Sequence, residues 1–171
     1  MVNQKLYHGG SQKINGPLQP ILVKDRPGYE HTLATVFATE RADIAALFML
    51  PYEVLSSISF EQDIAFICIW GTSKQLKGKD IQGYLYILPS DSFEKIGKEY
   101  EWQSLKEVLP LEVKEYPDLI IGMMECGVQV YFINDDPTFD RIVESKYDRA
   151  PIVKELVSEN QKLGINIKNF T

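Results

Sequence analysis

The segment KLYHGG, residues 5–10, stands near the start of the chain and carries one of its two histidines. It predicts a short strand over Lys5–His8, and the two glycines that follow admit two interpretations. One is a strand that ends in a glycine turn, with His8 as a partly buried structural residue. The other is a strand whose bare backbone meets a ligand: Gly9 would offer its N–H and C=O to a planar amide, and His8 a ring N–H to a hydroxyl. In a strand, His8 points away from the face shared by Tyr7 and Gly9.

The composition is that of an ordinary globular protein. The chain has 171 residues, 44% of them hydrophobic and 25% charged, which suits a single domain over residues 1–171. The net charge of −6 argues against a protein held to nucleic acid by a broad basic surface, although a local patch could still meet a nucleic-acid substrate. No apolar signal segment opens the chain, and no apolar run approaches the roughly 20 residues of a membrane helix. A cytoplasmic protein without membrane contacts is therefore expected.

Strands dominate the middle of the chain and helices are few. Apolar or alternating runs predict strands at residues 33–39, 64–70, 83–89, 98–104 and 128–133. The second of these is apolar throughout, as in a strand buried on both faces. Helical spacing predicts helices at residues 40–50, from the N-cap Asp136 with Pro137 at the first position, and at 150–164. Residues 120–126 fit either a helix or a strand. The pattern favours an α+β fold over a doubly wound α/β fold.

The segment VFAT, residues 36–39, runs into an alanine-rich helix and is a second candidate feature. Phe37 and Thr39 point the same way in a strand, and Thr39 can cap the helix. A strand that leads directly into a helix can build one wall of a cleft, with an aromatic ring to stack on a ligand. The alternative is ordinary core, in which Phe37 packs and Thr39 caps.

The segment EYEWQS is a third candidate feature. Glu99, Glu101 and Gln103 share one face of the predicted strand. Tyr100 and Trp102 share the other, which we expect to face the core. Neighbouring carboxylates repel each other, and an apolar environment would raise the pKa of one of them. The alternative is the solvated face of a half-exposed strand, which is the better interpretation for Glu99 and stays open for Glu101.

Other common chemistries leave no pattern in the sequence. No zinc-ligand spacing connects the histidines and cysteines, which are His8, His31, Cys68 and Cys126. Both cysteines lie in apolar segments, where we expect buried free thiols rather than a nucleophile or a disulfide. Neither a Walker loop nor a GxGxxG segment is present, and no metal is expected.

Taken in order, the three features resemble the ADP-ribosyltransferase superfamily, the group of the poly(ADP-ribose) polymerases and the diphtheria-toxin-like enzymes. LYHGG is similar to the family's His-Gly segment, VFATERADIAALF to its Tyr-Phe-Ala segment with the following helix, and EYEW stands where the catalytic glutamate would. The resemblance spans residues 6–104. It implies an α+β fold in which two antiparallel sheets form an NAD-binding cleft with a few flanking helices.

The resemblance also implies the reaction. NAD would be the substrate of an ADP-ribosyltransferase or an NAD hydrolase that cleaves the nicotinamide–ribose bond. The acceptor stays open among protein, nucleic acid, small molecule and water. Glu101 would hold the 2′-hydroxyl of the ribose and stabilise the positive charge that develops there. His8 would bind a ribose hydroxyl and act with Glu101 in catalysis.

The resemblance implies an NAD-binding set as well: Tyr7, His8, Gly9, Phe37, Thr39 and Phe48. The backbone of Gly9 would pair with the nicotinamide carboxamide, and Phe37 or Phe48 would stack near the ring. One position departs from the family, because Val36 stands where its tyrosine would. Two alternatives follow: a non-catalytic binding module with the same fold, or an enzyme like the RNA 2′-phosphotransferases, which hold phosphate with basic residues. Arg26 and Arg41 would be the basic candidates.

Overall fold

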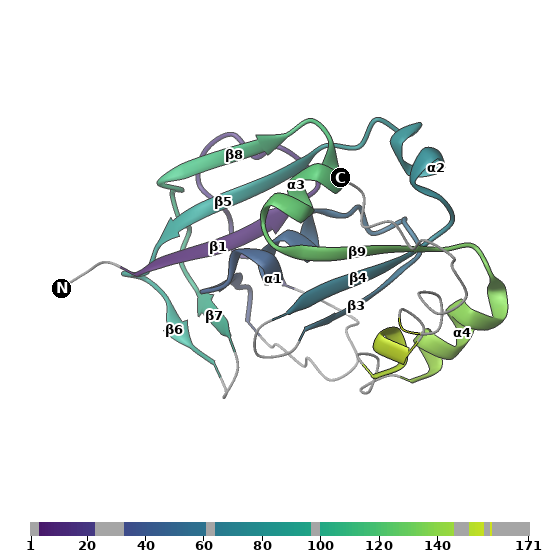
Figure 1. Ribbon diagram of the computed structural model, residues 1–171. Coiled ribbons are helices and arrows are strands. Elements are labelled where there is room, and N and C mark those ends of the chain that lie inside the picture. The colour runs from purple at the N-terminus through teal and green to yellow at the C-terminus, as the bar shows by residue number, and fades with distance from the viewer. Residues whose placement is uncertain are drawn as a thin grey trace.

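A computed structural model gives the structure of the protein and describes residues 4–22, 33–60, 64–96, 100–145, 151–155 and 158. Over these residues the chain forms an α+β arrangement, which confirms the predicted class. A six-stranded sheet and a three-stranded sheet pack against the helices that lie between them, α1 (Ala42–Ala46) and α3 (Leu119–Glu125) (Figure 1). Three residues named above lie outside the described part of the chain, Arg26, His31 and Glu99, as does most of the helix predicted at residues 150–164.

The larger sheet has the strand order β6-β7-β2-β1-β5-β8, and its neighbouring strands are antiparallel. Its strands are β1 (Lys5–Gly10), β2 (Val36–Thr39), β5 (Gly83–Pro89), β6 (Glu94–Lys95), β7 (Glu101–Ser104) and β8 (Glu112–Tyr116). β1 is central and continues through Gly9 and Gly10, which pair with Leu85 and Tyr84 of β5. The interpretation of these glycines as a turn is therefore wrong.

The smaller sheet has the order β3-β4-β9 and consists of β3 (Ser56–Phe60), β4 (Ala65–Trp70) and β9 (Val128–Ile133). β3 and β4 are antiparallel, but β4 and β9 are parallel, so the expectation of two antiparallel sheets is wrong for this pair. Five of the six residues of β4 are buried, as in parallel strands that are covered on both faces. The long connection between β4 and β9 gives room for the crossover that a parallel pair needs.

The described helices are short: α1, η1 (Leu47–Met49), α2 (Ser73–Lys77), α3 and α4 (Asp136–Glu144), with residues 151–155 also helical. α1 and η1 account for the helix predicted at residues 40–50. The segment at 120–126 is a helix, because Asp118 caps α3 and accepts hydrogen bonds from the N–H groups of Ile120 and Ile121.

The start of α4 differs by one position from the prediction. Asp135 is its N-cap and accepts a hydrogen bond from the Thr138 N–H, so Asp136 is already helical and Pro137 follows it. Proline is tolerated in this first turn because its missing N–H has no helical partner there. Within the described residues, no helix combines the length and the apolar character needed to cross a membrane.

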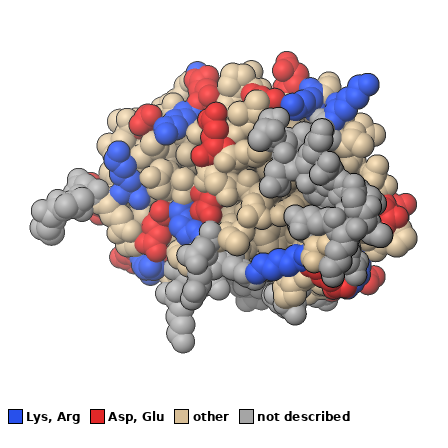
Figure 2. Space-filling view, viewed as in Figure 1, with Lys and Arg blue, Asp and Glu red and all other residues tan. Residues whose placement is uncertain are grey.

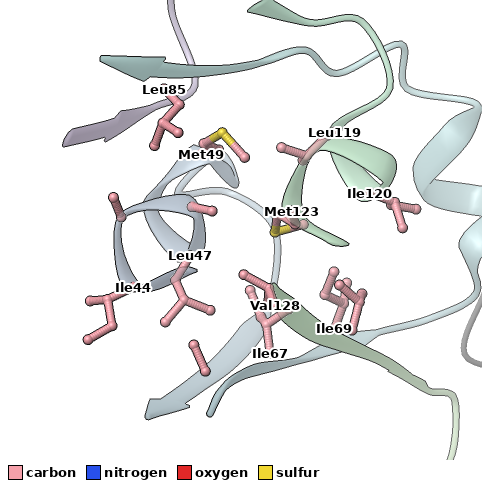
Figure 3. Packing of buried hydrophobic residues seen from close by; sticks show 14 of the residues in the cluster. Ile44, Leu47, Met49, Ile67, Ile69, Leu85, Leu119, Ile120, Met123 and Val128 are labelled. Carbon is pink, nitrogen blue, oxygen red and sulfur yellow. The ribbon is translucent and has the colours of Figure 1, made fainter. Parts of the chain in front are cut away.

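The main core lies between the two sheets. Met49 of the α1–η1 segment lies beside Leu85 of the larger sheet, Ile44 joins the same cluster from α1, and Ile67 and Val128 approach from the smaller sheet (Figure 3). Met49 and Ile67 are fully buried, and burying a side chain of this size contributes roughly 1.5–3 kcal/mol. This core therefore holds α1 against the face of β1 that carries Tyr7, which also packs there.

A second core covers the opposite face of the larger sheet. Its buried members are Leu6, Leu18, Val36, Ala38, Tyr84, Tyr86, Leu88, Phe93 and Val108. Leu18 and Val108 form an isolated bridge that closes two connecting segments over the sheet. The central strands of the larger sheet are thus covered on both faces, and a ligand would have to meet them where their pairing is incomplete.

Candidate functional site

The pairing of β1 with its two neighbours is unequal. β1 pairs with β5 at six positions, from Lys5↔Pro89 to Gly10↔Tyr84. Its register with β2 is a single pair, Tyr7↔Thr39, although both strands are fully described. β1 and β2 therefore part immediately after Tyr7, and we call this divergence the split.

His8 lies at the split and bonds across it. Its Nδ1 is 2.7 Å from the carbonyl oxygen of Phe37 in β2, and its ring centroid is 5.9 Å from that of Tyr86. Because a carbonyl oxygen only accepts, Nδ1 must carry the hydrogen and donate it.

The environment keeps the His8 ring neutral. Burial lowers the pKa of His8 below its ordinary value, and the hydrogen bond to Phe37 offsets part of that lowering. In the neutral ring with Nδ1 protonated, Nε2 is an acceptor. The expectation that His8 offers a ring N–H to a ligand hydroxyl is therefore corrected: toward a hydroxyl, its remaining nitrogen accepts.

Gly9 has a packing role that the sequence did not predict. It is buried, and a Cβ built on it would stand 1.9 Å from the carbonyl oxygen of Ala45 and 2.8 Å from the carbonyl carbon. The side of Gly9 on which a Cβ would stand is thus filled by the backbone of α1, and the expected contact of its N–H and C=O with a ligand stays a prediction. Gly10 differs, because its Cβ would meet Tyr86 at 3.5 Å, an ordinary contact. The first glycine lets a helix approach the strand closely.

Three predicted residues form a row across the larger sheet. The register pairs Tyr7 with Thr39 and Thr39 with Glu101, so β1, β2 and β7 bring them side by side. Directly opposite residues of antiparallel strands share a face. Thr39 is buried and Glu101 is half-buried at the first position of β7. Phe37 shares this face by strand alternation and is half-buried.

Two other predicted residues stand apart from this row. Alternation directs His8 to the opposite face of β1, where it contacts Tyr86, so His8 and Glu101 lie on opposite faces of the larger sheet, with β2 between their strands. Phe48 lies on η1 and is 41% exposed, with its neighbours Leu47 and Met49 buried. The structure thus joins Tyr7, Thr39 and Glu101 directly and places His8 at the next position of β1.

Thr39 does not cap α1 in the predicted way. The N-cap of α1 is Arg41, and no side chain caps it. Thr39 instead accepts a hydrogen bond on Oγ1 from the Arg41 N–H at 3.2 Å, which turns the chain from β2 toward the helix. Its hydroxyl is therefore engaged locally, beside Glu101.

Sequence reasoning missed a half-buried ion pair next to this row. Arg41 donates from Nε to Asp43 Oδ1 at 3.0 Å and from Nη2 to Asp43 Oδ2, and its guanidinium lies 4.8 Å from the centre of the Tyr100 ring. Tyr100 packs against the main core and Trp102 against the second, so the expectation that they share one core face is wrong. β7 begins only at Glu101, and strand alternation does not extend back to Tyr100.

Neither cysteine forms a disulfide, as predicted, but only Cys68 is buried as expected. Cys68 is buried in β4, whereas Cys126 is half-buried at the C-cap of α3, with Sγ 3.5 Å from the Tyr116 hydroxyl. Burial raises the pKa of Cys126, which keeps it a thiol at neutral pH. Neither cysteine has the environment of a nucleophile.

No family model, no curated protein and no solved structure matches the chain. The function is therefore argued from the split and from the row of Tyr7, Thr39 and Glu101. The surface adds one point: on the face shown in Figure 2, basic and acidic side chains are interspersed, with no broad basic area. This agrees with the net charge of −6.

Proposed function

We propose that the protein is an NAD-dependent ADP-ribosyltransferase or NAD hydrolase whose substrate binds at the split between β1 and β2. The observation that carries the proposal is the register Tyr7↔Thr39↔Glu101 with His8 at the adjoining position. The three segments that resemble the family are distant in the sequence, and they are neighbouring strands β1, β2 and β7 in the fold.

The hydrogen-bonding character of the site fits a sugar. His8 Nε2 and an ionised Glu101 carboxylate can only accept hydrogen bonds, as sugar hydroxyls require. Because the two side chains lie on opposite faces of the sheet, each would accept from a different hydroxyl of NAD. In the proposed reaction the nicotinamide–ribose bond breaks and nicotinamide leaves with the bonding electrons. Positive charge then develops on the ribose, and the Glu101 carboxylate stabilises it. An acceptor nucleophile, or water, bonds to the ribose carbon and releases a proton.

Arg41 gives little support to the phosphotransferase alternative, and Arg26, the other basic candidate, lies outside the described residues. A phosphate site needs a cation that is free to contact the ligand, and the guanidinium of Arg41 is instead held by Asp43 with only 15% of its side chain exposed. The departure at Val36 remains relevant to catalysis, because Val36 is buried in the second core and cannot stack on nicotinamide. The experiment must therefore distinguish an active enzyme from a non-catalytic binding module.

The test is nicotinamide release from NAD by the wild type, by Glu101→Gln and by the control Glu112→Gln. Glu112 is an exposed carboxylate on the edge strand β8, far along the sheet from β7. A charge that acts mainly in the transition state should lower kcat by on the order of 10²–10³ in Glu101→Gln with KM little changed. Glu112→Gln should match the wild type.

Each contrary result has a distinct meaning. If calorimetry detects NAD binding but the wild type releases no nicotinamide with protein, nucleic-acid or small-molecule acceptors or water, the protein is a binding module. If NAD does not bind, the proposal fails entirely. If Glu101→Gln is fully active and Glu99→Gln is inactive, the reaction stands and the glutamate is misassigned.

A further inference from the structure

The ion pair of Arg41 and Asp43 is rigidly attached to the start of α1. Both carboxylate oxygens of Asp43 receive the Arg41 fork, and Oδ1 also accepts the Ile44 N–H at 2.9 Å. The two side chains are only 15% and 16% exposed. A guanidinium held by two parallel hydrogen bonds has a fixed plane, unlike an exposed and mobile cation.

Arg41 contacts both neighbours of Glu101. Its guanidinium lies over the ring of Tyr100, the residue that precedes Glu101 in the chain, at 4.8 Å from the ring centre. Its backbone N–H donates to Thr39, the residue that pairs with Glu101 across the sheet. A cation at this distance over an aromatic ring is attracted to it, more strongly where water is excluded.

Glu101 lies at the end of a strand, where backbone pairing is least stable. It is the first residue of the four-residue β7, and its partner Thr39 is the last residue of β2. The ends of short ladders open more readily than their middles. Electrostatic catalysis requires a group that is already in place, so a residue that holds the start of β7 also holds the Glu101 carboxylate.

We propose that Arg41 is a positioning residue: held by Asp43, it fixes Tyr100 and so the start of β7, which sets the Glu101 carboxylate for the ribose. This rests on the proposed function for its chemistry, while the anchoring of β7 is independent of it. Arg41 itself touches no substrate in this role, because its fork is occupied by Asp43.

The test compares Arg41→Met, Arg41→Lys and the control Arg141→Met. Arg141 of α4 forms an exposed ion pair with Glu155. The first measurement is hydrogen exchange of the backbone amides at the start of β7, with β8 as internal reference. Loss of the stacked cation should accelerate exchange at Glu101 about tenfold in Arg41→Met and leave β8 unchanged. Arg41→Lys keeps the charge but loses the fork, and should fall between.

The second measurement is steady-state nicotinamide release. Arg41→Met should lower kcat about tenfold with KM within about twofold, because the carboxylate is displaced rather than removed. Unchanged exchange at Glu101 overturns the positioning role, whether or not nicotinamide is released. So does exchange that rises equally in β7 and β8, which would mark Arg41 as a general stabiliser.

Failure of the proposed function gives a different pattern. If no variant and no wild type releases nicotinamide while exchange at Glu101 alone accelerates in Arg41→Met, the anchoring of β7 is supported and the reaction is wrong. If Arg41→Met does not fold, Asp43→Asn replaces it, since it keeps the shape and weakens the hold on Arg41. The same two measurements then apply, and unchanged exchange at Glu101 again overturns the role.

Discussion

Replacing Gly9 by alanine should displace α1 from its contact with β1 and destabilise the fold. The added Cβ would lie 1.9 Å from the carbonyl oxygen of Ala45, and 3.4 Å from Cγ of Met49. The nearest atom belongs to the backbone of a helix, so no side chain can rotate away. To reach an ordinary contact of about 3.5 Å, α1 would have to move by roughly 1.6 Å. Ile44 and Ala45 of α1 are buried in the main core, so this movement loosens packing on both sides of the helix.

The magnitude follows from the kind of clash. Overpacking a core typically costs about 1–3 kcal/mol, and a clash with fixed backbone belongs at the upper end, about 3 kcal/mol or more. That is a large part of the roughly 5–15 kcal/mol by which a domain is stable. For a chain of this size, about 3 kcal/mol lowers Tm by roughly 6–12 °C.

Gly10→Ala is the matched control, since the two glycines are adjacent in one strand. Its Cβ would find Tyr86 at 3.5 Å and the Gln12 carbonyl oxygen at 3.7 Å, both ordinary contacts. Alanine in a strand interior gains about 0.5–1 kcal/mol over glycine, so Tm should be unchanged or slightly higher. Thermal and urea unfolding measure both variants. Equal stability of Gly9→Ala and Gly10→Ala would show that α1 is not seated on β1 as described.

Two further predictions concern a pH dependence and a second close approach. Because burial lowers the pKa of His8, the unfolded chain takes up the proton first, and the free energy of unfolding should fall as the pH drops below about 6.5, by at most about 1.4 kcal/mol per pH unit. His8→Asn keeps an amide that can donate to Phe37 and should remove the part of the pH dependence that arises from His8. If the urea midpoints of the two proteins change identically between pH 7 and 5, the prediction is contradicted. Gly122→Ala should lower Tm by about 4–8 °C, since its Cβ would lie 2.4 Å from Cγ and 2.5 Å from Cβ of Tyr116, a clash that rotation of Tyr116 cannot relieve. Adding Tyr116→Ala should recover part of that loss, and full additivity of the two changes would refute the contact.

Much of the fold could be predicted because buried strands and helices show regular patterns of apolar residues in the sequence. Apolar runs predicted β4, β5 and β9 within a residue of their observed bounds. Periodicity reports burial but not partners, so it could not show that β4 and β9 are parallel. It also could not decide whether Gly9 and Gly10 ended a strand, because glycine is equally permitted in a turn and beneath a helix.

The site was less predictable because it depends on register and on hydrogen-bond direction. The sequence placed candidates on three strands, but only the pairing Tyr7↔Thr39↔Glu101 shows which of them are neighbours. His8 can only accept from a ligand because its ring N–H already donates to the Phe37 carbonyl, which is 29 residues away in the chain. The contact of Arg41 with Tyr100 is equally non-local, and an arginine two positions before an aspartate gives no signal of it.

His8 can be both a structural residue of the sheet and a ligand-binding residue, because its two ring nitrogens can serve different partners. After Tyr7, β1 no longer pairs with β2. The His8 ring of β1 donates a hydrogen bond to the Phe37 carbonyl of β2 in place of a backbone N–H. His8→Ala would remove that donor from a partly buried carbonyl, at a cost of about 1–3 kcal/mol, and so would confuse lost binding with lost stability. Leaving β1 and β2 unpaired after Tyr7 forgoes ladder hydrogen bonds that would otherwise stabilise the sheet. Departures of this kind from an ideal sheet concentrate at functional sites. The His8 ring that donates to the Phe37 carbonyl keeps Nε2 as an acceptor, and this is why the proposed NAD site is to be tested at the split.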